Sequence, residues 1–105
     1  MTTFDKREEG FEKKFAVDEE LKFKGEARRN RLLGLWAAGK LGITGDAAVA
    51  YAKETVASAF AEGGEKALIA RLARDLSAHG ITEDTIRTQM IDLMAQAIVQ
   101  VRAGV

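Results

Sequence analysis

The sequence contains no proline, so glycine is the residue type that interrupts its helices. Between the glycines, alanine, leucine, lysine and glutamate are frequent, and all four favour helix. A chain of 105 residues has the length of about one domain and can bury a modest core without disulfides or metals. We therefore expect an all-α fold with a single core.

Two similar segments divide the helical regions, and each is typical of a turn between helices. GITGD at 42–46 is matched by GITED at 80–84. In each, a glycine can end a helix in the left-handed conformation, and an apolar residue follows it. The threonine hydroxyl can then cap the next helix, with an acid near its positive end. Two copies are too few for a solenoid, so the segments predict turns, not a repeat protein.

Apolar residues recur at helical spacing between these turns. The spacing predicts a first helix that ends near Leu41 and three more, at about Asp46 to Ala61, Glu65 to Ala78 and Glu83 to Arg102. Short connections between four helices favour an antiparallel, up-and-down four-helix bundle. The side chains expected in its core are Leu32, Leu33, Leu35, Trp36 and Ala37, with Gly39 on the same face; Val49, Ala52, Val56, Ala59 and Phe60; Ile69, Leu72, Ala73 and Leu76; and Ile86, Met90, Leu93, Met94, Ala97 and Val101, beside Ile91 and Ile98.

The amino-terminal segment is built differently from the rest. It is mostly charged, and Phe4, Phe11 and Phe15 fall at i, i+7 and i+11 along one helical face. Such a narrow stripe does not hold a short helix in water by itself. Two interpretations are open: a frayed, solvated terminus, or a docking arm that orders in a groove of a partner. We divide the chain into an arm at 1–17 and a four-helix bundle at 18–105.

Charge is balanced over the whole chain but clustered at one place. Sixteen Lys and Arg residues oppose sixteen Asp and Glu residues, so there is no overall attraction to nucleic acid or to anionic membranes. Arg28, Arg29 and Arg31 form the densest basic cluster. They suit a solvated face whose stems cover apolar surface, or a contact with phosphate or nucleic acid. We expect no nucleic-acid partner.

The sequence contains no convincing catalytic set. GLWAAGK at 34–40 satisfies G-x-x-x-x-G-K, but Leu41 stands where a magnesium-binding hydroxyl is needed and no strand precedes the motif. There is no cysteine, which excludes thiolate catalysis and cysteine metal sites, and His79 is the sole histidine. We expect a protein that is not an enzyme and has no metal site.

Membrane insertion is also not expected. No window approaches the ~20 apolar residues of a membrane helix, and the first residues lack the apolar core of a secretory signal. These patterns favour a cytoplasmic protein.

The stretch FDKREEGFEKKFAVDEELKFKGEARRNRLLGLWAA, followed by GKLGIT, resembles the zeta subunit of alphaproteobacterial F-type ATP synthases. The likeness spans nearly the whole chain and is most specific from Phe4 to Lys40. The resemblance implies a small four-helix protein that binds the catalytic headpiece, made of alpha, beta and gamma subunits, and restrains ATP hydrolysis. It also implies a cytoplasmic protein held at the inner membrane through the synthase and monomeric when free.

The resemblance further implies which segment acts on the partner. In that family the amino-terminal segment is the inhibitory arm, inserted between nucleotide-binding subunits near the rotating shaft. It corresponds here to Thr2 through about Phe15. The partner-binding residues expected on this basis are Phe4, Arg7, Glu8, Phe11, Lys14 and Phe15.

An alternative function is a small helical module that binds adenine nucleotides and has little or no inhibitory activity. Members of the family that the chain resembles are thought to bind such a nucleotide weakly, and helical bundles often hold ligands between helices. No cofactor is required on this interpretation; ATP or ADP is a weak ligand. The first candidates for contact with it are Arg28, Arg29, Arg31, Trp36 and Lys40.

Overall fold

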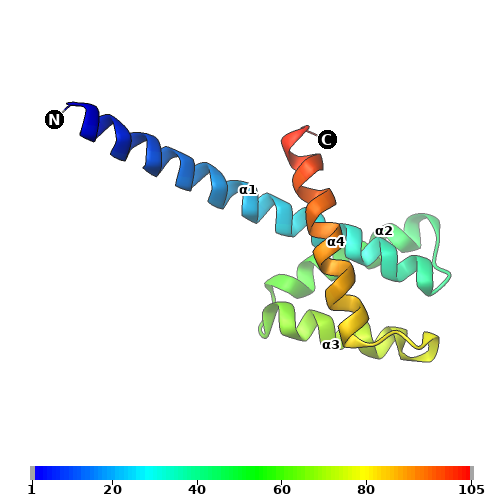
Figure 1. The fold of residues 1–105 in the computed structure, drawn as a ribbon. Coiled ribbons are helices and arrows are strands. Elements are labelled where there is room, and N and C mark those ends of the chain that lie inside the picture. Colours follow the sequence, from blue (N-terminus) through cyan, green and yellow to red (C-terminus); the bar gives the residue numbers. More distant parts are fainter. Residues whose placement is uncertain (1, 105) are drawn as a thin grey trace.

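The computed structural model describes the backbone of residues 2–104 and the side chains of residues 19–104. The described backbone forms four α-helices and one short 3-10 helix, and none of it is β-strand (Figure 1). The elements are α1 (Thr2–Lys40), α2 (Gly45–Phe60), α3 (Gly64–Leu76), η1 (Ser77–His79) and α4 (Glu83–Arg102). The predicted all-α fold with four helices is confirmed. The predicted frayed arm lies outside the described side chains.

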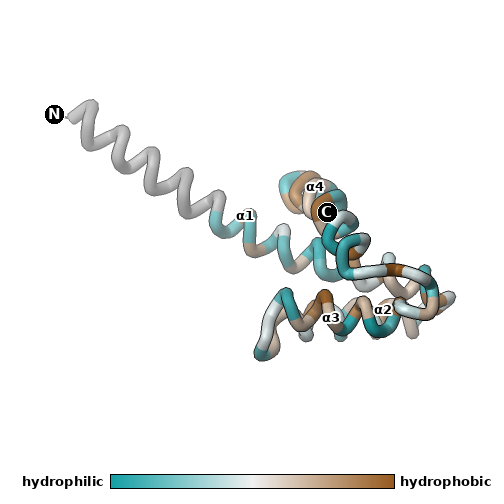
Figure 2. The backbone as a smooth tube through the Cα atoms, turned by 60° about the horizontal axis from the view of Figure 1, so that its bottom comes forward, coloured by the Kyte–Doolittle hydropathy of each residue, from teal (hydrophilic) through white to brown (hydrophobic). Residues whose placement is uncertain are grey.

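Helix α1 is the element on which both α2 and α4 pack. Its most extensive contacts are with α2 and α4, whereas α3 packs mainly on α2 and α4 and touches α1 only slightly. In Figure 1, α4 crosses α1 near the middle of the fold. Figure 2 shows hydrophobic and hydrophilic residues mixed along α2, α3 and α4, as expected of amphipathic helices. Within the described part of the chain, no helix is both long enough and apolar enough to cross a bilayer.

The core is formed by large aliphatic side chains from three of the helices. The largest apolar side chains that are almost completely buried are Leu33, Leu68, Leu72, Leu76 and Ile86. Each stabilises the fold by roughly 1.5–3 kcal/mol relative to an exposed side chain. The predicted core faces of α3 and α4 are confirmed at Ile69, Leu72 and Leu76 and at Ile86, Met90, Leu93 and Ala97.

The prediction for the core face of α1 was partly wrong. Leu35 is 36% exposed and Gly39 is exposed, while Leu32 and Trp36 are only half-buried at the edge of the core. Leu33 and Ala37 are buried as predicted, and the residues near them that are buried without having been predicted are Gly34 and Ala38. Most of these are small, because α1 lies between neighbours that approach it closely.

Two glycines of α1 mark its closest approaches to other helices. A Cβ atom built on Gly34 would lie 2.6 Å from the Cα of Ala52 and 2.7 Å from the hydroxyl of Thr55, both in α2. One built on Gly25 would lie 2.7 Å from the Cδ1 of Ile98 in α4. Since an ordinary contact is about 3.5–4.0 Å, no side chain fits at Gly34 without separating α1 from α2.

Three further core predictions, two in α2 and one in α4, were wrong because the apolar residues are exposed. In α2, Val49 and Phe60 are 42% and 63% exposed; Ala52 is buried as predicted, and so is Thr55, which was not predicted. The close contact at Gly34 explains this, because small side chains fill the space between α1 and α2. In α4, Ile91 is 73% exposed, although this helix contacts both α1 and α3 as its broad stripe predicted.

The two predicted turns form, and they differ at their caps. Gly42 and Gly80 have φ of 75° and 71°, the left-handed conformation that ends the preceding helix. The hydroxyl of Thr82 accepts a hydrogen bond of 3.3 Å from the Thr85 amide, as predicted. Thr44 makes no side-chain cap, so that prediction was wrong. The first turn has Gly45, with φ of 62°, where the second has Glu83, so the chain enters α2 with a different geometry.

Candidate functional site

The residues predicted to bind the partner lie outside the described side chains. These are Phe4, Arg7, Glu8, Phe11, Lys14 and Phe15, and their roles stay predictions. What the structure describes is the part of α1 that follows them. Residues 19–24 are exposed apart from half-buried Leu21, and the first buried residue described in α1 is Gly25. The division into an arm at 1–17 and a bundle at 18–105 also stays a prediction.

The basic cluster divides over two sides of α1. Arg28 donates a hydrogen bond of 3.1 Å from a guanidinium nitrogen to Oε1 of Gln100 in α4. Arg29 donates to Oδ1 of buried Asn30 at 3.1 and 3.2 Å and lies 3.5 Å from the Glu65 carboxylate. Neighbouring positions differ by about 100° around a helix, so consecutive arginines face different neighbours.

A groove with both basic and apolar walls runs along one of these sides. Its cationic lining is Lys24, Arg28 and Arg31, and its apolar lining includes Val56 and Val101. It encloses a cavity of about 550 Å³. Lys24 is also 3.0 Å from Glu20, in an exposed i,i+4 ion pair that is worth little. We call this the basic groove.

The other candidate nucleotide contacts lie elsewhere on α1. Lys40 and Trp36 are one turn apart near its carboxyl end, with the ammonium 5.9 Å from the centre of the indole ring. Arg29 is directed to Glu65 in α3. Of the five candidates, the structure therefore brings only Arg28 and Arg31 together in one groove.

The phosphate-loop motif at 34–40 lies inside α1. Gly34 is packed against the α2 backbone, and Ala37 and Ala38 are completely buried. The segment therefore has no loop of exposed amides for a phosphate, in agreement with its interpretation from sequence. Among the described residues, no group of three His, Cys, Asp or Glu side chains could hold a metal ion.

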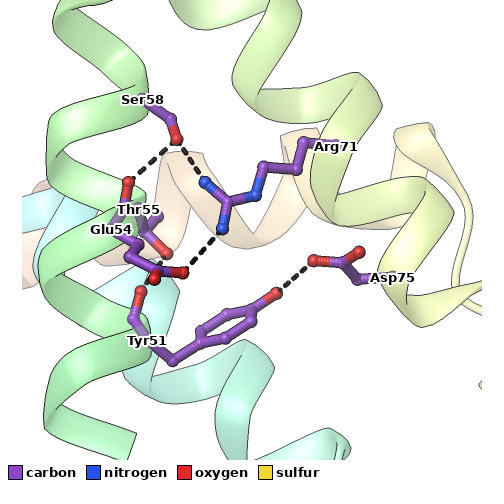
Figure 3. Close-up of polar contacts among 6 residues, drawn as sticks. All are labelled: Tyr51, Glu54, Thr55, Ser58, Arg71 and Asp75. Carbon is purple, nitrogen blue, oxygen red and sulfur yellow. Dashed lines mark hydrogen bonds and ion pairs between the residues drawn. The ribbon is translucent and has the colours of Figure 1, made fainter.

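A polar network joins α2 to α3 (Figure 3). The Tyr51 hydroxyl donates a hydrogen bond of 2.9 Å to Asp75, and Arg71 lies 2.9 Å from Glu54 and donates to the Ser58 hydroxyl. Burial, followed by the hydrogen bond to the Asp75 carboxylate, raises the pKa of Tyr51 to about 12. The phenol is thus neutral at physiological pH, and the network holds two helices together.

Sequence reasoning missed this network, although a signal was present. Glu54 and Ser58 are one turn apart, and so are Arg71 and Asp75. The short Gly63-Gly64 turn connects their helices as a hairpin, which places Arg71 beside Glu54 and Ser58, and Asp75 beside Tyr51. Arg71 follows Gly64 by seven residues, a separation between those of Ser58 and Glu54 on the other side of the turn, so it can reach both of them.

Comparison with known proteins agrees with this architecture. Residues 1–100 match the model of the family described as "ATPase inhibitor subunit zeta". A solved structure described as "Solution NMR structure of the protein" is 40% identical, with a TM-score of 0.71, over 81% of this chain and 99% of that one. No curated protein matches the chain. The match to the family extends over almost all of the sequence, and the chain belongs to the ATPase inhibitor subunit zeta family.

Proposed function

We propose that this chain binds the catalytic headpiece of an F-type ATP synthase and restrains ATP hydrolysis through its amino-terminal arm. The observation that carries the proposal is the family match over residues 1–100, which includes the whole predicted arm. The protein then acts as a regulatory subunit and not as an enzyme. Its partners are the alpha, beta and gamma subunits. A chain that is monomeric when free would be held at the inner membrane through them.

The packing of α1 supports a protein in which the bundle is rigid and the arm binds the partner. From Gly25 to Ala38, α1 is clamped between α4 and α2 at the two close glycine contacts. The bundle therefore provides a rigid support for the residues that precede residue 19. Residues 19–24 are largely exposed, which leaves this part of α1 open to a partner.

The arm supplies the binding energy in this proposal. Burial of Phe4, Phe11 and Phe15 in a cleft contributes ~1.5–3 kcal/mol for each ring, which offsets the entropy lost when the arm orders. An arm that binds one rotary state better than the others shifts the motor towards that state. Hydrolysis is blocked when the favoured state is one through which hydrolysis must pass.

The experiment is ATP hydrolysis by the cognate headpiece in the presence of the full chain or of a version that lacks residues 1–15. We expect inhibition by the full chain and its loss in the shortened version. Equal inhibition by both would refute the role of the arm. If the full chain does not bind the headpiece, the proposed function is wrong.

The basic groove favours a second candidate function, the weak binding of an adenine nucleotide. Arg28, Arg31 and Lys24 suit the phosphates, and Val56 and Val101 offer apolar surface for the base. Titration with ATP or ADP, followed by residue-level chemical shifts, tests this. Shifts should centre on the groove and shrink in Arg31→Ala but not in the control Arg74→Ala on α3. A spectrum that does not move at millimolar nucleotide excludes the site.

A further inference from the structure

A second groove lies along α4 and is lined by Arg29, whereas Arg28 and Arg31 line the basic groove. Its apolar lining is Met90, Ile91, Met94, Ala95 and Ile98, and its charged lining is Arg29, Glu65 and Arg87. The cavity measures about 480 Å³, within the range of binding sites. Methionines give such a lining an adaptable shape, which suits contact with side chains of a protein. We call this the α4 groove.

The apolar surface continues along α4 beyond this cavity. A neighbouring hollow of about 360 Å³ is lined by Ala95, Gln96, Val99 and Gln100, and Ala95 lines both. Ile91 and Val99 are 73% and 68% exposed. Eight residues separate them, or about 12 Å along a helix. A strip of this length matches the i, i+4 and i+7 anchors of a helix in a groove, and it is longer than one small molecule fills.

The charged groups at the groove indicate the chemistry of its occupant. Arg29 has a side chain only 11% exposed, held 3.5 Å from Glu65, so its guanidinium is fixed in place. Arg87 is half exposed, and its contacts with Glu83 and Asp84 are long, at 3.7 and 3.6 Å. Exposed pairs at such distances contribute little and exchange readily for a better partner. A carboxylate that arrives beside the apolar lining can form a bidentate pair with Arg87.

We propose that the α4 groove binds an amphipathic helix of the synthase headpiece, with apolar anchors against Ile91, Ala95 and Val99 and a carboxylate against Arg87. The inference rests on the proposed function, which supplies the partner, and adds to it a second contact separate from the arm. The proposed contact explains why Ile91 is exposed although it is apolar and does not pack in the core of the bundle. The bundle then takes part in binding and is more than a support for the arm.

The first test measures the affinity of full-length variants for the headpiece. Ile91→Asp places a charge in the groove, and Val49→Asp places the same charge on an exposed apolar residue of α2. Both positions are exposed, so both variants should fold, which circular dichroism checks. We expect Ile91→Asp to weaken binding at least tenfold, as a central anchor does, and Val49→Asp to change it less than threefold. Equal effects of the two variants would overturn the proposal.

The second test identifies the occupant directly. The chain has no cysteine, so Ile91→Cys or Val49→Cys creates one unique position for a photo-crosslinker. With the headpiece present, we expect the Ile91→Cys probe to form a crosslink to a headpiece helix that carries Asp or Glu beside its apolar face, and the Val49→Cys probe to form none there. Crosslinks to residues 1–18 of the same chain, or to a second copy, would overturn the proposal and identify a different occupant.

The two tests separate this inference from the proposed function. Suppose that the unaltered chain inhibits hydrolysis while Ile91→Asp binds the headpiece as tightly as Val49→Asp does. The α4 groove then does not bind the headpiece, and the proposed inhibitory function is unaffected. If the unaltered chain shows no binding, both are wrong. If Ile91→Asp weakens binding and loss of residues 1–15 abolishes inhibition, both are supported.

Discussion

The contact between α1 and α2 at Gly34 predicts that Gly34→Ala destabilises the protein, whereas glycine to alanine usually stabilises a helix. Glycine to alanine inside a helix normally stabilises it by about 0.5–1 kcal/mol. At Gly34 the added methyl carbon would lie 2.6 Å from the Cα of Ala52, a backbone atom that cannot rotate away. The helices would have to separate by about 1 Å, and overpacking of this kind costs about 1–3 kcal/mol. We therefore expect Gly34→Ala to lower the free energy of unfolding by about 1–2 kcal/mol.

Gly39→Ala is the matched control, because it makes the same change in the same helix. A Cβ atom on Gly39 would meet nothing within 4 Å. We expect this variant to gain up to about 1 kcal/mol. The measurement is thermal unfolding followed by circular dichroism, in which 1 kcal/mol shifts Tm by about 4–8 °C for a domain of this size. If Gly34→Ala raises Tm as Gly39→Ala does, the result would contradict the close contact between α1 and α2 at Gly34.

Two further predictions concern the core and the polar network. Leu72→Ala, at a side chain 1% exposed, should cost about 2–5 kcal/mol in urea unfolding, and Leu35→Ala, at 36% exposure, should cost clearly less; equal losses would contradict the core described for α3. The chain has one tyrosine, so the ultraviolet absorbance of its phenolate reports Tyr51 alone, and the midpoint should be near 12 when the chain is folded and near the ordinary value of 10 in denaturant. Because the unfolded tyrosine loses its proton first, the stability that this difference contributes is complete below about pH 10 and is lost as the pH rises towards about 12. Tyr51→Phe should abolish that part of the pH dependence, and a folded midpoint near 10 would contradict the half-buried hydrogen bond to Asp75.

The sequence predicted the buried residues best in helices whose apolar residues lie mainly on one face. In α3, Ile69, Leu72 and Leu76 stand at helical spacing and are buried as predicted, although Leu68, which is completely buried beside them, was not predicted. In α1, apolar residues occur on several sides, and periodicity favoured Leu35. The packing instead exposes Leu35 and buries Gly34 and Ala38 beside the predicted Ala37, because the distance between helices decides which side chains fit.

The candidate site was predictable only in part, for a similar reason. The sequence showed a cluster of arginines, but not that Arg28 bonds to Gln100 while Arg29 faces Glu65. Those partners lie 72 and 36 positions away in the chain, and their proximity depends on how α4 and α3 pack on α1. The exposure of Ile91 depends on that packing as well. The roles of Phe4, Phe11 and Phe15 stay predictions, because these residues lie outside the described side chains.

The central claim is that this zeta-family chain restrains ATP hydrolysis through the phenylalanines of its arm. The most direct measurement is the ATP hydrolysis rate of the cognate headpiece, titrated with the unaltered chain and with a full-length variant in which Phe4, Phe11 and Phe15 are alanine. We expect saturable inhibition by the unaltered chain and at least a tenfold weaker effect of the variant, because three buried rings are lost, with Tm of the bundle nearly unchanged. Equal inhibition by the two proteins, or a hydrolysis rate that the unaltered chain does not lower, would contradict it.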